Sequence, residues 1–187
     1  MEIFLSLIQN PYFIQGFGLV GTILALVGMQ SKSYSRLAAC KIGNEVIDGI
    51  HYLLLGQFDG AIVNFVSCTT NPVYWHRIKR GKSTLPFQIA FGLLFVSIVL
   101  WQWNGWISIF ILVAKLLSSV ALGINSVRVI RILNLISSGC WLLYSFYVGS
   151  VAGILTNVLL LISLISAIVR IDIRERRIAS RALRAPA

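Results

Sequence analysis

The segment GQFDGAIVN at residues 56–64 returns later in the chain as GSVAGILTN at residues 149–157. The two segments lie 93 residues apart and share glycine at the first and fifth positions and asparagine at the last. Arg77 returns at the same offset as Arg170. Matches between Leu and Val mean little in an apolar chain, but a polar residue kept in register with two glycines is specific. The repeat therefore predicts two similar units, the plan on which many transporters are built.

The composition predicts a membrane protein. Of the 187 residues, 57% are hydrophobic and 12% are charged, whereas about a quarter of the residues of soluble domains are charged. A membrane-spanning helix needs about 20 mostly apolar residues. We expect seven such helices, at approximately residues 12–30, 38–56, 59–76, 85–103, 106–124, 132–148 and 150–170. The spans use most of the chain, so we expect an all-α membrane protein with no separate soluble domain.

The basic residues predict how these helices are oriented, because Lys and Arg concentrate in cytoplasmic loops. With the N-terminus outside and the C-terminus in the cytoplasm, every basic residue except Lys115 falls in a cytoplasmic segment. These residues are Lys32, Arg36, Lys41, Arg77, Lys79, Arg80, Lys82, Arg128, Arg131, Arg170, Arg174, Arg176, Arg177, Arg181 and Arg184. The net charge of +10 therefore needs no nucleic acid to explain it. A basic tail beside a membrane also interacts with anionic lipid headgroups.

The repeat and the predicted topology together indicate a 3+1+3 arrangement of helices. Residues 1–78 form the first three-helix repeat, residues 79–104 a basic loop and a linker helix, and residues 105–170 the second repeat. Residues 171–187 form a basic cytoplasmic tail. The offset is four helices, an even number, so both repeats have the same orientation in the membrane. Parallel repeats of this kind place a shared cavity between them, near the membrane midplane.

One face of the second span is polar. Its residues are Lys41, Asn44, Glu45, Asp48, His51 and Tyr52, which fall within about 120° of one another at 100° per residue. Charged groups at bilayer depth cost ~2.5–3.5 kcal/mol each on insertion scales, so they should face a cavity or pair with one another. Lys41 and Glu45 are four residues apart and can form an ion pair, which is either a structural pair near the helix end or part of the cavity. Asp48 lies deeper, and we expect it to line the cavity.

Two further titratable residues are candidates for coupling or gating. His51 lies three residues after Asp48 and can pair with it, either as a hydrogen-bonded structural residue or as part of a proton-coupling pair. Lys115 lies in the middle of the fifth span, where an unpaired ammonium is costly. We therefore predict that Lys115 approaches Asp48 or Glu45 across the bundle, as a structural pair or as a gate.

No metal site or cofactor is expected. His51 and His76 lie on different spans and complete no metal-binding motif. The cysteines have neither metal-ligand spacing nor the pattern of a disulfide framework, and we expect them to be reduced, buried thiols. They are Cys40, Cys68 and Cys140.

Residues of both repeats resemble the YgjV family of bacterial inner-membrane proteins. The residues that carry the resemblance are IHYLLLG at 50–56, Gly60, Ala61, Asn64, Cys140, Trp141, Gly149, Ser150 and Gly153. It extends over approximately residues 16–170. The resemblance implies a location in the bacterial inner membrane.

More remotely, the 3+1+3 plan resembles the SWEET sugar transporters and their half-size relatives, the SemiSWEETs. In that group a Trp on the second helix of a unit and an Asn sixteen residues later line the substrate cavity. Trp141 and Asn157 have this spacing, and Trp141 and Tyr144 match the Trp-x2-Tyr pattern of the group. In the first repeat Asp48 and Asn64 have the same spacing, with Asp48 in place of the Trp. The resemblance implies that these five residues surround a substrate cavity. The prolines typical of the first helix of each SWEET unit are absent here.

These observations favour a transporter of a small polar solute, a sugar or a sugar-like molecule, working by alternating access between the repeats. The alternative is a non-transporting membrane scaffold or partner subunit, in which the same polar residues are packed shut as hydrogen bonds between helices. An enzyme is not expected, because the sequence has no nucleophile–base pair and no phosphate-binding loop, and the loops are short. The expected partners are the lipid bilayer, an unidentified solute and further copies of the chain.

Overall fold

The computed structural model describes residues 10–173. Within them the chain forms seven α-helices and a final π-helical turn, and no strand, which confirms the predicted all-α fold. The elements are α2 (Pro11–Gln30), α3 (Tyr34–Leu54), α4 (Phe58–Lys79), α5 (Leu85–Trp101), α6 (Ile107–Leu122), α7 (Val127–Tyr147), α8 (Val151–Ala167) and the turn η1 (Ile168–Ile173).

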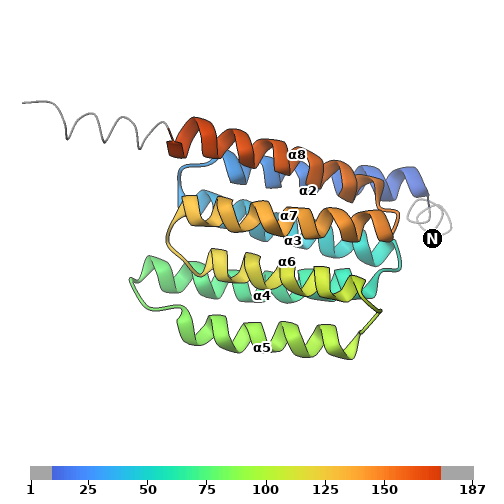
Figure 1. Ribbon diagram of the computed structural model, residues 1–187, viewed down its shortest axis with the longest axis horizontal. Coiled ribbons are helices and arrows are strands. Elements are labelled where there is room, and N and C mark those ends of the chain that lie inside the picture. Colours follow the sequence, from blue (N-terminus) through green and yellow to red (C-terminus); the bar gives the residue numbers. More distant parts are fainter. Residues whose placement is uncertain (1–9, 174–187) are drawn as a thin grey trace, which may run out of the picture.

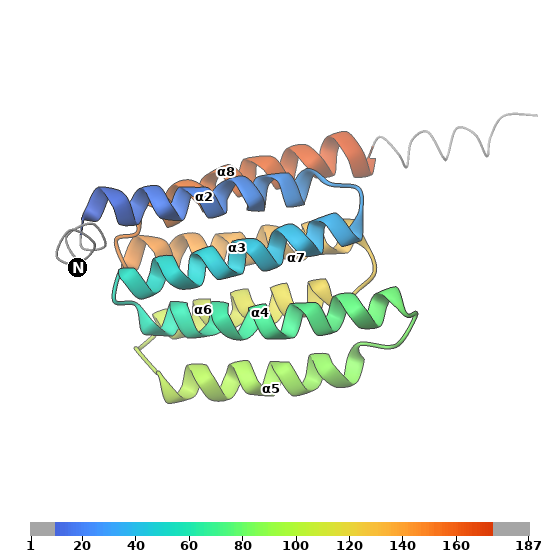
Figure 2. The ribbon, with the colours of Figure 1, turned by 180° about the vertical axis from the view of Figure 1, so that it is seen from behind.

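The helices form two layers (Figure 1). In one layer α2, α3 and α4 pack side by side, and in the other α6, α7 and α8 do so. Figure 2 shows the first layer from the front, with α5 at the edge of the bundle, where it packs against α6 and α4. Across the layers α2 packs against α8 and α4 against α6, whereas α3 and α7 are not among the closely packed pairs of described helices. The centre of the bundle therefore has room for side chains from both layers.

The repeated glycines form equivalent turns in the two layers. Gly56 ends the turn between α3 and α4 with φ +72°, and Gly149 occupies the same place between α7 and α8 with φ +66°. This left-handed conformation carries little cost for glycine, which lacks a Cβ atom. After the second turn the Ser150 hydroxyl accepts a hydrogen bond from the Gly153 amide at 2.9 Å and so caps the start of α8.

Two apolar clusters hold the ends of the bundle. The first contains Met29, Leu37, Ala38, Tyr74, Ala121, Leu122, Ile130 and Leu164. The second, at the opposite ends of α3, α4, α6 and α7 and on α5, contains Tyr52, Ala61, Val63, Phe95, Val99, Ile111 and Tyr144. Buried polar and charged residues occupy the layer between the two clusters, among them Glu45, Asn64, Lys115, Ser137 and Asn157. The core is thus apolar at both ends and polar in the middle.

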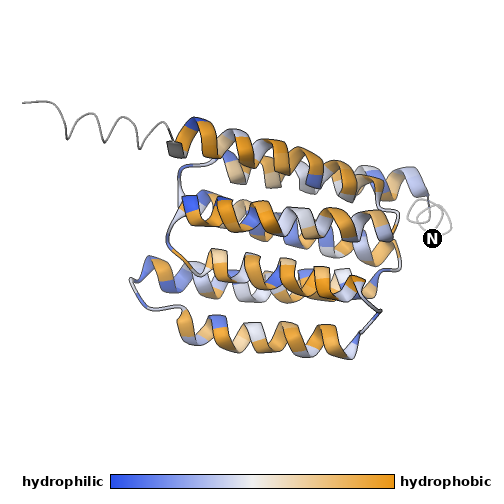
Figure 3. Cartoon of the chain, in the orientation of Figure 1, coloured by the Kyte–Doolittle hydropathy of each residue, from blue (hydrophilic) through white to orange (hydrophobic). Residues whose placement is uncertain are grey.

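The outside of the bundle is apolar. Figure 3 shows that hydrophobic residues dominate α5, α6 and α8. Large apolar side chains on the outer surface are strongly exposed, for example Ile23 at 62%, Leu93 at 64% and Ile162 at 61%. Among the described residues, three segments are long and apolar enough to cross a membrane, namely α2, α7 and Val151–Ile171. The apolar helices α5 and α6 have 17 and 16 residues, somewhat short of the ~20 that a full span needs.

Several basic residues lie in helices and not in the loops in which the sequence placed them. Helix α7 begins at Val127, five residues before the predicted start of its span, and so includes Arg128 and Arg131. Helix α3 likewise begins before its predicted span and includes Arg36. The helices extend beyond the apolar stretch where a basic side chain near the helix end finds a partner on another element, as Arg131 does at the backbone carbonyls that end α2. Arg131, which is only 1% exposed, is the clearest case.

Replacing Gly153 by alanine is expected to destabilise the fold by about 1–3 kcal/mol, the usual range for overpacking. An added Cβ would lie 2.6 Å from the Ser145 hydroxyl oxygen and 2.7 Å from that of Ser150, which is the cap of α8. The measurement is the free energy of unfolding in detergent micelles. Gly139→Ala is the matched control, because a Cβ at this site in α7 meets nothing within 4 Å. An equal effect of the two substitutions would contradict the prediction.

Candidate functional site

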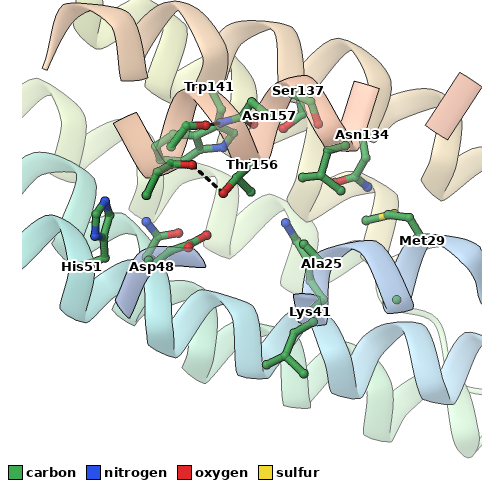
Figure 4. A pocket seen from close by; sticks show the side chains of 18 of the residues that line it. Ala25, Met29, Lys41, Asp48, His51, Asn134, Ser137, Trp141, Thr156 and Asn157 are labelled. Carbon is green, nitrogen blue, oxygen red and sulfur yellow. Dashed lines mark hydrogen bonds between the residues drawn. The ribbon is translucent and has the colours of Figure 1, made fainter. Parts of the chain in front are cut away.

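A cavity lies between the two layers, in the polar zone of the bundle. It is lined mainly by α2, α3, α7 and α8, with Asn64 from α4 and Lys115 from α6. Figure 4 shows Asp48 and His51 on one side of the cavity and Trp141, Thr156 and Asn157 on the other. The volume of the cavity is about 50 Å³, which is enough for a few water molecules.

Most of the residues that the sequence singled out line this cavity. They are Asp48, His51, Asn64, Lys115, Trp141 and Asn157. Glu45 lies behind Lys115 and is not part of the lining. Tyr144 does not line the cavity either: it is fully buried in the apolar cluster beside it, and its hydroxyl donates to Asp59 at 2.7 Å. The implied lining role of Tyr144 is therefore wrong, because its ring packs sideways against neighbouring aromatic rings.

Lys115 is the centre of a saturated hydrogen-bond cluster. Its ammonium donates to Glu45, to Asn64 Oδ1 at 2.8 Å and to the Ser67 hydroxyl at 3.0 Å. An ammonium has three N–H donors, so every one of them has a partner. Of the two acids predicted to approach Lys115, Glu45 is the partner and Asp48 is not. The cluster joins α6 of one layer to α3 and α4 of the other.

Glu45 is shared by two lysines. One carboxylate oxygen bonds to Lys115, and the other lies 3.2 Å from the Lys41 ammonium. The side chain of Glu45 is 3% exposed and that of Lys41 is 14% exposed. The predicted ion pair of Lys41 and Glu45 is therefore formed, and Lys41 also lines the cavity. Burial of a charge is tolerated where it is paired and hydrogen-bonded, as both Glu45 oxygens are.

Asn64 and Asn157, the asparagines of the repeat, make the same hydrogen bond to the backbone of their own helix. Their side-chain oxygens differ in whether they have a partner. The Asn64 amide donates to the Gly60 carbonyl, and the Asn157 amide donates to the Gly153 carbonyl, each at 2.8 Å. The Asn64 oxygen accepts from Lys115. The Asn157 oxygen accepts no hydrogen bond from any described residue. The repeat thus supplies one asparagine that is fully engaged and one whose oxygen is available in the cavity.

Asp48 is the cavity carboxylate without an ion pair among the described residues. One of its oxygens accepts from the Asn44 amide at 3.0 Å. The other lies against Gly21 of α2, where an added Cβ would come within 3.0 Å. Asp48 is half-buried although it lines an internal cavity. Its charge is therefore balanced only at longer range, by Lys41 and Lys115.

His51 does not pair with Asp48. Its Nδ1 lies 3.0 Å from the Ile14 carbonyl and its Nε2 lies 2.9 Å from the Ser150 hydroxyl. A carbonyl only accepts, so Nδ1 carries a proton and donates to Ile14. Both ring nitrogens are thus occupied by bonds that join α3 to α2 and α8. Of the two interpretations left open by the sequence, this geometry fits the hydrogen-bonded structural residue.

Aromatic rings close one end of the cavity. Tyr52 and Trp141 are stacked, with centroids 5.8 Å apart, and Tyr144 packs at 5.5 Å from each of them. The Lys115 ammonium lies 5.3 Å from the centroid of the Trp141 ring, within the range of a cation–π contact. The Trp141 face thus already accommodates an ammonium group.

The sequence analysis missed several polar residues of the site. The Thr22 and Thr156 hydroxyls are hydrogen-bonded to each other between α2 and α8. Ser137 and Ser138 line the cavity from α7. Both serines lie three or four residues before Trp141 and therefore on the same face of the helix. This spacing could have identified them from the sequence. Small hydroxyl residues are common in apolar helices, where they bond to their own backbone, so that signal is weak.

The titratable and thiol residues form no metal site among residues 10–173, where no group of three His, Cys, Asp or Glu is close enough to hold an ion. Cys40, Cys68 and Cys140 are free thiols. They are half-buried at the sides of helices, so the expectation that they are buried is wrong.

Comparisons with known proteins identify the chain by family. A comparison with curated proteins gives no match, and neither does a comparison with solved structures. The family model Imp-YgjV, described as bacterial inner membrane protein, matches residues 12–175. This range covers the seven described helices except Pro11 and confirms the resemblance carried by the repeat residues. The chain belongs to the YgjV family of bacterial inner membrane proteins.

Proposed function

We propose that the protein transports a small polar solute through the cavity between its two layers. The observation that carries the proposal is the position of this cavity. Polar groups are expensive in a bilayer, so a polar cavity at the centre of the bundle favours a protein in which a polar solute binds or passes. The apolar clusters at both ends of the cavity would then be the barriers that open alternately. The remote resemblance to SWEET transporters makes sugars and sugar-like molecules the first solutes to test.

The mechanism we propose is alternating access between two parallel three-helix units. The first unit is α2–α4, the second is α6–α8, and α5 is the linker in a 3+1+3 arrangement. Support comes from the equivalent turns at Gly56 and Gly149 and from the equivalent amide bonds of Asn64 and Asn157. The packing of α2 on α8 and of α6 on α4 relates the units in the same way. Transporters built from parallel repeats bind their substrates at the interface between the repeats.

We further propose that the first residues of α2 face the periplasm and that the C-terminal tail is cytoplasmic. The distribution of basic residues supports this orientation. Lys32, Arg80 and Lys82 lie in turns at one end of the bundle, together with the helix ends that carry Arg36 and Arg128. In this orientation His51 and Ser150 close the periplasmic side of the cavity.

Purified protein in liposomes is expected to take up at least one member of a pool of radiolabelled sugars, sugar acids, amino sugars and amino acids. Asn157→Ala and Trp141→Ala, each of which removes cavity lining, should lower the initial rate about tenfold, the equivalent of ~1.4 kcal/mol. Ser97→Ala is the control, because this hydroxyl is exposed on α5 and bonds to its own helix at the Leu93 carbonyl. No uptake of any solute by a folded protein would sink the proposal.

A membrane scaffold is the second candidate, and one observation favours it. The Lys115 ammonium, the Asn64 oxygen and the Glu45 carboxylate are all satisfied by one another, as in polar contacts that hold membrane helices together. A scaffold predicts that the cavity substitutions change stability and nothing else. The same liposome experiment therefore separates the two functions.

A further inference from the structure

We infer that the cavity is built to bind a protonated amine, so that the transported solute carries an ammonium group. The inference rests on the proposed transport function and names its substrate class. It starts from the hydrogen-bonding atoms that face the cavity and have no partner among the described residues. Around Asp48 and Asn157 these atoms include two acceptors, and a solute that satisfies both must bring donors.

The first acceptor is the carboxylate of Asp48. Glu45, one turn earlier on the same helix, keeps both oxygens bonded to Lys41 and Lys115. Because the three donors of Lys115 are already used, this ammonium cannot also turn to Asp48. Among the described residues, only the neutral Asn44 amide is a direct partner of Asp48. The carboxylate is therefore left with one oxygen and its charge to be matched by a ligand.

The second acceptor lies across the cavity on α8. Asn157 is 7% exposed, its amide nitrogen is bonded to Gly153, and its oxygen has no donor among residues 10–173. Ser138, which is 5% exposed, also lines the cavity, and its hydroxyl makes no hydrogen bond within the described chain. Figure 4 shows Asp48 and Asn157 on opposite sides of the cavity. A group between them must donate hydrogen bonds in two directions.

The Trp141 ring also lines the cavity, and the Lys115 ammonium lies 5.3 Å from its centroid, within the range of a cation–π contact. The solute is therefore recognised by the two acceptors and not by this ring. A protonated amine can satisfy both acceptors, because it carries a positive charge and up to three N–H donors. A neutral hydroxyl donates only one hydrogen bond and leaves the charge of Asp48 unmatched. The polar middle of the cavity thus favours an ammonium group over a hydroxyl at the same place.

Lys41 also lines the cavity, and its positive charge would repel an amine that approached it. It lies seven residues before Asp48, about two helical turns or ~10 Å along α3, and Figure 4 shows the two residues well apart. The Lys41 ammonium is held by Glu45, 3.2 Å away, and is not a direct partner of Asp48 among the described residues. The volume of about 50 Å³ suits a group of a few non-hydrogen atoms.

The test compares glucosamine with glucose, which differ by one amine in place of one hydroxyl, for uptake into liposomes at neutral pH. We expect glucosamine to enter about tenfold to a hundredfold faster, the range for one hydrogen bond to a charged group. Asp48→Asn should remove this preference, and Asp48→Glu, which keeps the charge, should retain most of it. Asp59→Asn, an acid-to-amide change outside the cavity lining, should leave the preference unchanged.

Glucose that enters as fast as glucosamine would overturn the inference and leave the transporter intact, as would a preference that survives Asp48→Asn. If no solute enters, the transport proposal fails, and binding to the purified protein in detergent then decides the inference separately. Titration calorimetry with ethanolamine should give heat with the unaltered protein and with Asp48→Glu, but not with Asp48→Asn. The absence of binding to the unaltered protein would overturn the amine site. Thermal unfolding of each variant shows that it is folded.

Discussion

Replacing Lys115 by methionine is expected to lower the free energy of unfolding by about 3–5 kcal/mol, the range for removing one partner of a buried ion pair. The ammonium is 2% exposed and holds Glu45, Asn64 and Ser67 at once. Without it, the Asn64 oxygen has no donor and Glu45 keeps only the ion pair with Lys41. Methionine has a similar length, so the loss reports on the charge and its bonds more than on an empty space.

Equilibrium unfolding in mixed detergent micelles measures this effect. Lys41→Met is the matched control, since this lysine is more exposed and makes one ion pair, with a glutamate that keeps Lys115. Its expected cost is about 1 kcal/mol or less. In the double variant Lys115→Met with Glu45→Gln, the buried carboxylate is also neutralised. We expect the double variant to recover part of the stability, because a buried charge without its partner is worse than no charge. A loss of unfolding free energy below about 1 kcal/mol for Lys115→Met would contradict the role of Lys115 as a stabilising buried partner of Glu45.

Replacing Arg131 by methionine is expected to cost about 2–5 kcal/mol, because two buried acceptors lose a charged donor. The guanidinium donates from Nε to the Met29 carbonyl at 3.0 Å and from an Nη to the Ser31 carbonyl at 2.8 Å. The last carbonyls of a helix have no partner within it, and a cation beside them is favourable. Arg131 of α7 therefore caps the end of α2 in the other layer.

The same unfolding measurement tests this role. Arg128→Met is the control, because Arg128 lies one turn earlier on α7 and is only half-buried. It is expected to cost less than about 0.5 kcal/mol, as for most surface substitutions. Equal losses for the two arginines would show that helix capping by Arg131 is not what stabilises this end of the bundle. Arg131→Lys should lie between, since an ammonium keeps the charge but lacks the planar fork of donors.

The helices themselves follow from local sequence. Runs of apolar residues interrupted by Gly56, Gly81, Gly105 and Gly149, all with positive φ, mark where helices stop. These signals act over a few residues, and the predicted spans therefore match the observed helices closely. The start of α7 was misplaced because the apolar pattern begins after Arg131. Nothing local to Arg131 indicates that its partners are carbonyls 100 residues and more away.

The candidate site was predictable in its members but only partly in its bonds. Spacing on one helix face identified Glu45, Asp48 and His51 together, and the cost of an unpaired charge predicted an acid beside Lys115. Which acid that was, and where His51 would bond, depended on contacts between α3 and three other helices. Neighbouring positions on one helix therefore led to different partners: Glu45 meets α6, whereas His51 meets α2 and α8.

By itself the sequence determined an apolar helical bundle of the inner membrane with a repeat and a polar stripe on α3, because hydrophobicity, helical period and turn glycines are local properties. Only the tertiary structure decided that Lys115 neutralises Glu45, that Arg131 caps α2, and that Asp48 and Asn157 keep free acceptors across one cavity. Those outcomes depend on which helices pack together, because a side chain can bond only to groups that the folded bundle brings within its reach. Asn64 and Asn157 are equivalent in sequence, yet only Asn64 meets a lysine, since the residue equivalent to Lys115 in α2 is Thr22.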